Sequence, residues 1–331
     1  MLFLLFLFAA GIRHPIAAAQ GEMMEGEGCS PWISGEDLAK EKSKNSLEKT
    51  YSGDLNKKAR KFYKAAYKHR KSKKGFRVNQ KISMKVSRSS FRSGKMWKSK
   101  KMKAYDRSIG KATDALIASN IDSYWIKYYT WKYYYRYRWT SRNKVSVRIY
   151  YVKLKPVERY KGAKKELSAV KKAAKRIAAK IKKTRPDKSR FTTARLIFEY
   201  LIKTVSYGSN HGVQYSPASA LLSKYKGISV CDGYARAFKM ICDYCGVPCL
   251  YVSSSPAEHA WNMVKLENGK WYGVDVTWGD DGSTADYYWF MYGKNDAVSG
   301  DHAVKAINGP KDNYYQFSLP ALSSTGKRYN G

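Results

Sequence analysis

The stretch GISVCDGYARAF, residues 227–238, places a cysteine at the expected start of a helix. After Cys231, apolar residues recur at helical spacing, so the helix is expected to begin at or just before the cysteine. The N–H groups and the dipole at a helix N-terminus favour an anion, here the thiolate of Cys231. The same N–H groups can hold the oxyanion of a tetrahedral intermediate. For a lone cysteine, a buried structural role is the more common alternative.

Two further segments supply a histidine and an aspartate: EHAWN at residues 258–262 and WYGVDVTW at 271–278. Alternating side chains predict a β-hairpin, with a return strand over residues 270–277. Taken singly, His259 fits a core histidine and Asp275 fits a solvated carboxylate. Together, Cys, His and Asp in three different local settings are the parts of an activated thiolate nucleophile.

The loop of this hairpin decides whether His259 and Asp275 share a face. A two-residue turn would put them on opposite faces, because side chains alternate along a strand. A three-residue loop over residues 267–269, with Gly269 in the left-handed position of a bulge, puts them on one face as diagonal neighbours. We predict the three-residue loop. The opposite face then carries apolar side chains that suit a core: Val264, Leu266, Tyr272, Val274 and Val276.

These segments resemble the transglutaminase-like superfamily, a branch of the papain-like cysteine enzymes, and in particular its secreted bacterial members. VCDGYARAF at residues 230–238 resembles the nucleophile segment, HAWN the histidine motif and VDVTW the aspartate motif. GVPC at 246–249 is similar to the segment that leads into the next strand, and residues 194–207 resemble the helix that precedes the core. The close match runs over about residues 190–302.

The resemblance implies roles for three residues. Cys231 would be the nucleophile, His259 the general base and acid, and Asp275 the group that orients His259. The N–H of Cys231 would supply one oxyanion donor. Glu258 stands where members usually carry a small residue, often glycine, and its carboxylate is expected to raise the pKa of His259.

The second oxyanion donor is left open by the sequence. Members often have a tyrosine before the cysteine, and here that position holds Ala218. Tyr215 and Ser216 are the candidates to replace it, and Trp261 is a candidate for positioning the substrate.

The implied fold is α+β, with the cysteine helix packed on an antiparallel sheet that carries the histidine and the aspartate. The implied chemistry is attack of the thiolate on a protein or peptide amide, such as that of glutamine, to leave a thioester. Transfer of the acyl group to a lysine amine would make a transglutaminase, and transfer to water an amidase or peptidase. The alternatives are a non-catalytic cell-surface binding or scaffold protein on the same fold and an adhesin whose own lysines accept the acyl group. No cofactor or metal is predicted.

The charge of the chain is the second strong signal. Its 331 residues include 63 Lys and Arg against 26 Asp and Glu, a formal net charge of +37. Basic runs lie at residues 57–74 and 95–103. Such charge indicates adhesion to polyanions, for example an anionic cell-wall polymer, with a merely solubilising surface as the alternative. No nucleic-acid-binding motif is present in the sequence, and no specific nucleic-acid partner is predicted.

The sequence divides into five segments. Residues 1–19 read as a secretory signal, which predicts a secreted or cell-surface protein, and no other stretch is apolar enough to span a membrane. Residues 20–50 form a polar, flexible leader, and 306–331 a C-terminal extension. Residues 190–305 are the transglutaminase-like core. The basic, aromatic-rich segment 51–189 is expected to hold helices at 55–70, 108–120 and 164–183, a strand at 76–86 and a hairpin over 124–149.

Overall fold

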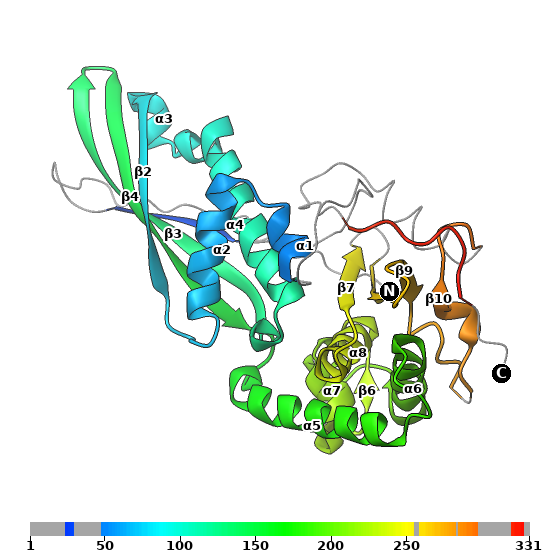
Figure 1. The fold of residues 1–331 in the computed structure, drawn as a ribbon. Helices are drawn as coiled ribbons and strands as arrows, with labels where there is room; N and C mark the ends of the chain where they lie inside the picture. The colour runs from blue at the N-terminus through cyan, green and yellow to red at the C-terminus, as the bar shows by residue number, and fades with distance from the viewer. Residues whose placement is uncertain (1–23, 30–47, 255–257, 283, 297–318, 328–331) are drawn as a thin grey trace, which may run out of the picture.

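The computed structural model describes residues 24–29, 48–254, 258–282, 284–296 and 319–327. They form two units that lie side by side, each built from one antiparallel sheet and a set of helices (Figure 1). Among the described residues, no helix combines the length and the apolar character needed to cross a bilayer. The predicted secretory signal lies outside the described residues.

The N-terminal unit contains a four-stranded antiparallel sheet in the order β1-β3-β4-β2. The strands are β1 (Met24–Cys29), β2 (Phe76–Ser87), β3 (Ile126–Ser141) and β4 (Lys144–Glu158). Strands β3 and β4 form the long hairpin that the aromatic and β-branched alternation predicts. Strand β1 lies within the segment expected to be a flexible leader and pairs along β3, so residues 24–29 differ from that prediction.

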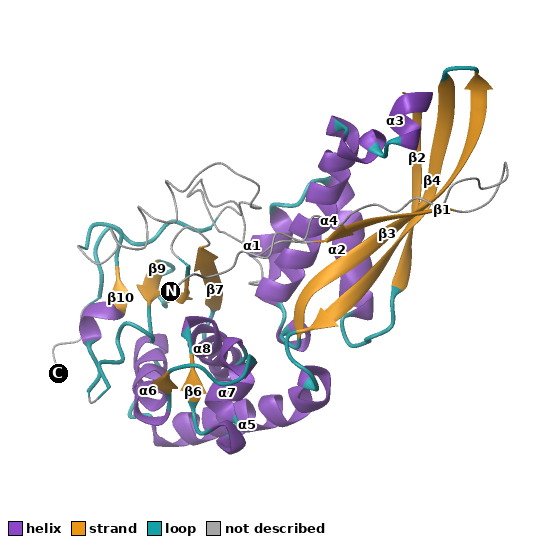
Figure 2. Cartoon of the chain, turned by 180° about the vertical axis from the view of Figure 1, so that it is seen from behind, coloured by secondary structure: helices purple, strands orange, loops and turns teal. Residues whose placement is uncertain are grey.

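Helices cover one face of this sheet (Figure 2). Helix α2 begins where the Asn56 side chain accepts the N–H of Ala59, and α4 begins where Ser99 accepts the N–H of Met102. Helix α4 begins before the predicted 108–120, at the Ser99 cap. The sequence does not predict this first part of the helix, because it lies in a lysine-rich run without clear helical periodicity. The helical segments are α1 (Glu48–Gly53), α2 (Lys57–His69), α3 (Arg88–Arg92), η1 (Lys95–Lys98), α4 (Lys100–Ser119) and η2 (Ile121–Ser123).

The C-terminal unit pairs four helices with a second antiparallel sheet, in the order β10-β9-β8-β7. Its helices are α5 (Ala163–Thr184), α6 (Arg190–Thr204), α7 (Pro217–Leu221) and α8 (Cys231–Cys245), with short 3-10 turns η3 (Val213–Tyr215), η4 (Ser223–Tyr225) and η5 (Tyr287–Trp289). Its strands are β7 (Cys249–Ser254), β8 (His259–Lys265), β9 (Trp271–Val274) and β10 (Phe290–Tyr292), and the short β5 (Ser206–Tyr207) and β6 (Ile228–Ser229) pair in parallel.

The second sheet is buried on both faces, and this positions the site. Val264 and Val274 belong to one apolar cluster with Phe238 of α8. Trp261 and Met263, on the other face, belong to a second cluster that includes the helices of the N-terminal unit. The sheet therefore lies between α8 and the N-terminal unit, and this mixture of helices and antiparallel strands fits the predicted α+β fold.

Two predicted boundaries need correction. The helix expected over 194–207 ends at Thr204, and Ser206–Tyr207 form strand β5 beside β6. Helix α5 packs its apolar stripe, including Val170 and Ile177, into the same cluster as α8. It therefore belongs to the C-terminal unit, although the sequence led us to begin the core at residue 190.

Candidate active site

Helix α8 begins at Cys231, as the sequence predicts. Its N-cap is Val230, which has no side chain able to accept a hydrogen bond, so no side chain caps the first turn. The α2, α4 and α6 helices are instead capped by Asn56, Ser99 and Ser189. The uncapped first turn is where an oxyanion would accept a hydrogen bond from the N–H of Cys231.

Close packing around residue 233 explains why the cysteine segment has a glycine at this position. A Cβ added at this position would lie 2.0 Å from Ser229 Oγ and 2.5 Å from the carbonyl oxygen of Gln214. The Gln214 carbonyl also accepts the N–H of Val230 at 3.2 Å. The absence of a side chain at Gly233 thus lets the segment before Ser216 pack directly against the start of the cysteine helix.

The hairpin loop has the predicted three-residue form. Leu266 and Lys270 close it, with the Leu266 N–H donating to the Lys270 carbonyl at 3.1 Å, and Gly269 has a φ of 77°. The register that follows pairs Val264 with Tyr272, as expected from this loop. The predicted core face is buried.

His259 and Asp275 meet as this register predicts. His259 Nε2 lies 2.5 Å from Asp275 Oδ2, and Asp275 is fully buried. The other carboxylate oxygen accepts the N–H groups of Thr277 and Trp278 at 3.0 and 3.1 Å. These bonds turn the backbone, so the strand ends at Val274 and not at Thr277 as predicted.

The surroundings of the His259 imidazole raise its pKa. Burial lowers the pKa of His259, but hydrogen bonds to Asp275 and Cys231, together with electrostatic interactions with the same two residues, outweigh burial and raise it to about 9. With Nε2 on Asp275, the other ring nitrogen is left for the thiol of Cys231. The sequence led us to expect that Glu258 raises this pKa. Glu258 is instead exposed and is not among these causes, so that expectation is wrong.

Two indole rings flank the His259 imidazole. Trp278 stacks on it with ring centroids 4.4 Å apart and planes 11° apart. Trp261, a predicted site residue on the same strand, stacks more distantly at 6.0 Å. A tryptophan face favours a neighbouring cation, so both rings support the charged imidazole. We had treated Trp278 only as part of the aspartate motif, because its stacking depends on the turn after Asp275.

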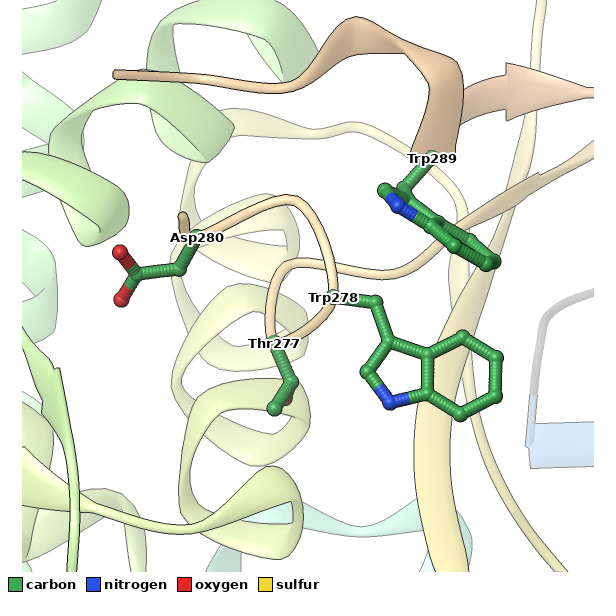
Figure 3. A pocket seen from close by; sticks show the side chains of 4 residues that line it. All are labelled: Thr277, Trp278, Asp280 and Trp289. Atoms are coloured by element: carbon green, nitrogen blue, oxygen red, sulfur yellow. The ribbon is translucent and has the colours of Figure 1, made fainter. Parts of the chain in front are cut away.

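An open pocket of about 450 Å³ lies at Trp278, the indole that stacks on His259 (Figure 3). Thr277, Trp278, Asp280 and Trp289 line it. Trp289 meets Trp278 edge-on at 4.7 Å. Asp280 accepts a hydrogen bond from the buried Tyr234 hydroxyl at 2.6 Å, and its carboxylate is directed away from the two indoles. The pocket therefore has two indoles in its wall, one of which stacks on His259.

The candidates for the second oxyanion donor lie in the segment before the cysteine. Ser216 is buried, and its hydroxyl accepts the N–H of Ala218 at 3.2 Å as the cap of α7. Tyr215 is 44% exposed. Tyr207, which is 65% exposed, lies near Cys231 and Tyr215. Its pKa is raised mainly by partial burial and, to a smaller extent, by electrostatic interactions with these two residues. Tyr207 was missed because the sequence placed it at the end of a helix.

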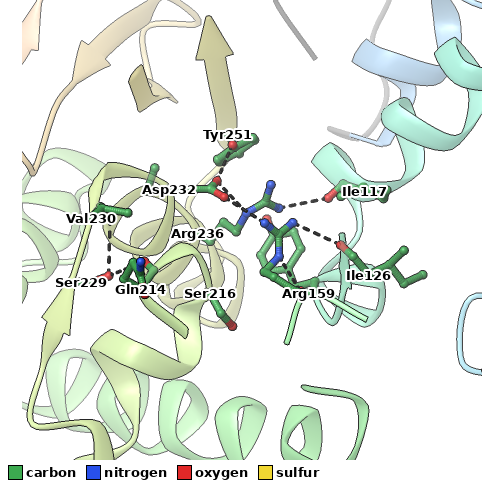
Figure 4. Close-up of polar contacts among 12 residues, drawn as sticks. Ile117, Ile126, Arg159, Gln214, Ser216, Ser229, Val230, Asp232, Arg236 and Tyr251 are labelled. Carbon is green, nitrogen blue, oxygen red and sulfur yellow. Dashed lines mark hydrogen bonds and ion pairs between the residues drawn. The ribbon is translucent and has the colours of Figure 1, made fainter. Parts of the chain in front are cut away.

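A buried ionic cluster surrounds Asp232, the residue after Cys231 (Figure 4). Arg159 and Arg236 each donate to its carboxylate at 2.9 Å, and the Tyr251 hydroxyl donates at 2.5 Å. Arg159 also donates to the carbonyl of Ile126 at 3.1 Å. The first turn of α8 is thus tied to the N-terminal unit and to strand β7. Sequence reasoning missed this cluster, because Arg159 is one basic residue among many.

The fold and this geometry define a class: an α+β domain with a cysteine at a helix N-terminus and a histidine–aspartate pair on the adjoining sheet. Residues 162–276 match the transglutaminase-like superfamily, and that part of the chain is a transglutaminase-like domain. The match begins at the start of α5, in agreement with the packing of that helix on α8.

Two curated relatives share part of this region. The chain is 37% identical over 78 residues to the kyphoscoliosis peptidase of Mus musculus, covering 19% of this chain and 12% of that protein. It is 41% identical over 63 residues to the kyphoscoliosis peptidase of Homo sapiens, covering 15% and 9%. The chain thus matches about a tenth of the length of these relatives.

Proposed function

We propose that this protein is a cysteine acyl-transfer enzyme that acts on protein or peptide amides and, in its main reaction, hydrolyses them. The observation that carries the proposal is the contact of His259 with both Cys231 and Asp275, in a domain of the transglutaminase-like superfamily. The relatives are named peptidases, which agrees with hydrolysis.

The reaction follows from the charges at the site. The thiolate of Cys231, paired with the imidazolium of His259, forms a bond to the amide carbon. His259 then gives its proton to the leaving nitrogen as the C–N bond breaks, and a thioester remains. Water attacks the thioester, His259 takes its proton, and the acid and the thiolate are released. Asp275 holds the imidazole in place and stabilises its charge in both steps.

The oxyanion of each tetrahedral intermediate would accept a hydrogen bond from the N–H of Cys231 at the uncapped start of α8. Of the two predicted candidates for a second donor, we favour Tyr215, because it is exposed to an approaching substrate whereas Ser216 is buried. Trp261 and Trp278 would orient the imidazole and border the bound peptide.

The open pocket at Trp278 supports water as the acceptor, because exclusion of water is what favours transfer to an amine. Transamidation is the second candidate reaction. Asp280, which lines the pocket, favours it, since its negative charge would attract the ammonium group of a lysine acceptor. Secretion, predicted from residues 1–19, would place either reaction outside the cell.

The test uses the intact protein with casein and a fluorescent primary amine, with peptide cleavage, ammonia release and amine incorporation followed together. We expect cleavage or ammonia release that is lost in Cys231→Ala. Cys245→Ala is the matched control, because it removes a half-buried thiol from the same helix. Incorporation that exceeds hydrolysis would assign the chain to the transamidating branch.

A chemical test that needs no substrate distinguishes this enzyme from a non-catalytic scaffold protein on the same fold. We expect iodoacetamide to alkylate Cys231 at pH 6, where an ordinary thiol is almost fully protonated, and to do so far more slowly in His259→Gln. An equal, slow rate in both proteins would mean that the thiol is not activated and would contradict the proposal.

A further inference from the structure

The sheet of the N-terminal unit has one face under helices and one face turned away from them (Figure 2). Strand burial alternates, with apolar residues such as Val147 and Ile149 packed inward and Arg148 exposed between them. The exposed positions of the outward side are mostly cationic. We call this set the outer sheet face: Arg77, Lys85, Lys132, Arg136, Arg138, Lys144, Arg148, Lys153 and Lys155.

Like charges stand directly opposite one another on this face. Arg136 on β3 pairs in register with Arg148 on β4, and Arg77 on β2 pairs with Lys153 on β4. Like charges opposite each other destabilise a sheet. Within the described part of the chain, the four cations of these two pairs form no ion pair that would offset this cost. A bound polyanion would remove it.

Tyrosine rings contact three of the four arginines of the outer sheet face. The Arg77 guanidinium lies 4.7 Å from the ring of Tyr151. The Arg136 and Arg148 guanidiniums lie 5.5 and 5.2 Å from the ring of Tyr150. A stacked guanidinium keeps its planar fork of donors oriented, which suits bidentate binding of carboxylate or sulfate groups.

These contacts also narrow the class of partner. Tyr151 stacks on Tyr134 at 4.4 Å and carries Arg77, so these rings are occupied and do not offer a platform for nucleobases. The large exposed hydrophobic residues among the described ones, Tyr207, Tyr215 and Tyr288, all lie in the other unit. The outer sheet face therefore has no apolar anchor for a lipid bilayer.

We propose that the outer sheet face binds an acidic polysaccharide, an extended polymer that presents carboxylate or sulfate groups without bases or acyl chains. Neighbouring strands lie about 4.8 Å apart, so the paired cations of β2, β4 and β3 form rows across the sheet that several anionic groups of one polymer can meet together. This binding goes beyond the acyl-transfer reaction and does not depend on it.

The test compares two triple variants of the intact protein that lose the same charge. R136Q/R148Q/K153Q neutralises the outer sheet face, and K172Q/K175Q/R176Q removes three exposed cations from α5. Heparin and polygalacturonate are the probes, with duplex DNA and anionic lipid vesicles as competitors. In about 0.15 M salt, we expect at least a roughly tenfold loss of polysaccharide affinity in the first variant and less than about twofold in the second.

Two further readouts keep the proposal testable. The slope of log affinity against log salt should fall by about three in the outer-face variant only. Its melting temperature without ligand should rise, because like-charge pairs are removed. Equal losses in both variants would reduce the effect to net charge and overturn the proposal. Preference for DNA or vesicles over both polysaccharides, or no binding to either polysaccharide, would overturn it too.

Discussion

Arg159 donates a hydrogen bond of 2.9 Å to Asp232, the residue that follows Cys231 in the chain. Arg159 comes directly after strand β4 of the N-terminal unit, and both side chains are buried. Tyr251 donates to the same carboxylate from β7, the strand beside the one that begins with His259. The cluster thus fixes the start of the cysteine helix against the sheet that carries the histidine.

Replacement of Arg159 by methionine should slow the alkylation of Cys231 without unfolding the protein. The Asp232–Arg236 pair stays balanced in this variant, so we expect a loss of about 1.5–3 kcal/mol in the free energy of unfolding, as for one charge-assisted hydrogen bond. Because a small displacement of Cys231 from His259 weakens their pairing, iodoacetamide alkylation at pH 6 should slow by about tenfold.

Arg138→Met is the matched control for this experiment. It removes an exposed arginine from the same unit and should leave both the alkylation rate and the unfolding midpoint unchanged. Unaltered alkylation in Arg159→Met would mean that the cluster supports folding only. Partial recovery in Arg159→Lys, which restores the charge without the fork of donors, would support a positioning role.

Asp232→Asn should destabilise the protein more than Arg159→Met does. The asparagine leaves two buried arginines, Arg159 and Arg236, without an anion, and breaking a buried ionic group in this way costs about 3–5 kcal/mol. Urea unfolding of the two single variants and the double variant measures this order. The double variant should be more stable than Asp232→Asn alone, and the opposite order would contradict the electrostatic explanation.

The features of the site that depend on local sequence patterns were predicted more successfully than the features that depend on long-range contacts. The start of α8 and the loop closed by Leu266 and Lys270 depend on residues within a few positions, so periodicity and parity identified both. The end of the strand at Val274 was missed, because it depends on the Asp275 carboxylate accepting backbone N–H groups. The partnership of Arg159 and Asp232 spans 73 positions, and no local pattern predicts it.

The pH dependence of stability should reveal the imidazolium of His259. Its pKa is about 9 in the folded protein, raised above the ordinary 6.5, so its contribution is complete below pH 6.5 and is lost as the pH rises through 9. We expect a loss of at most about 3 kcal/mol from pH 6 to 9.5. Urea unfolding of wild type and His259→Gln measures it by difference, and an unchanged difference across this range would refute the ion pair.

The same proton sets the alkaline limit of catalysis. The rate constant kcat/KM should fall above about pH 9, where His259 loses the proton that it gives to the leaving group. We call this fall of kcat/KM at high pH the alkaline limb. In Asp275→Asn the alkaline limb should move toward pH 6.5, because the Asp275 carboxylate is the main group that raises the pKa of His259. Thr277→Ala is a control that keeps the Asp275 carboxylate, and its limb should stay near pH 9.

Trp278 should contribute to the same limb through its ring. It stacks on His259 at 4.4 Å, and such a contact with a cation amounts to about 0.5–1 kcal/mol. Trp278→Leu should therefore lower the alkaline limb by about half a pH unit. Trp289→Leu, which alters the same pocket without touching the imidazole face, is the control. Equal shifts in the two variants would indicate a change in pocket solvation and not in the stacking.

Glu258 offers a test that separates backbone strain from charge. Its φ of 48° lies in the left-handed region, where glycine is at ease and other residues are strained, so the backbone explains why a small residue suits this position. Glu258→Gly should raise the free energy of unfolding by about 0.5 kcal/mol, because the relief of strain exceeds the extra entropy of the unfolded chain. Glu258→Gln should leave stability unchanged. Since Glu258 is not among the main causes of the raised pKa of His259, both variants should keep the alkaline fall of kcat/KM near pH 9. A fall at lower pH in both variants would mean that the Glu258 carboxylate does raise this pKa.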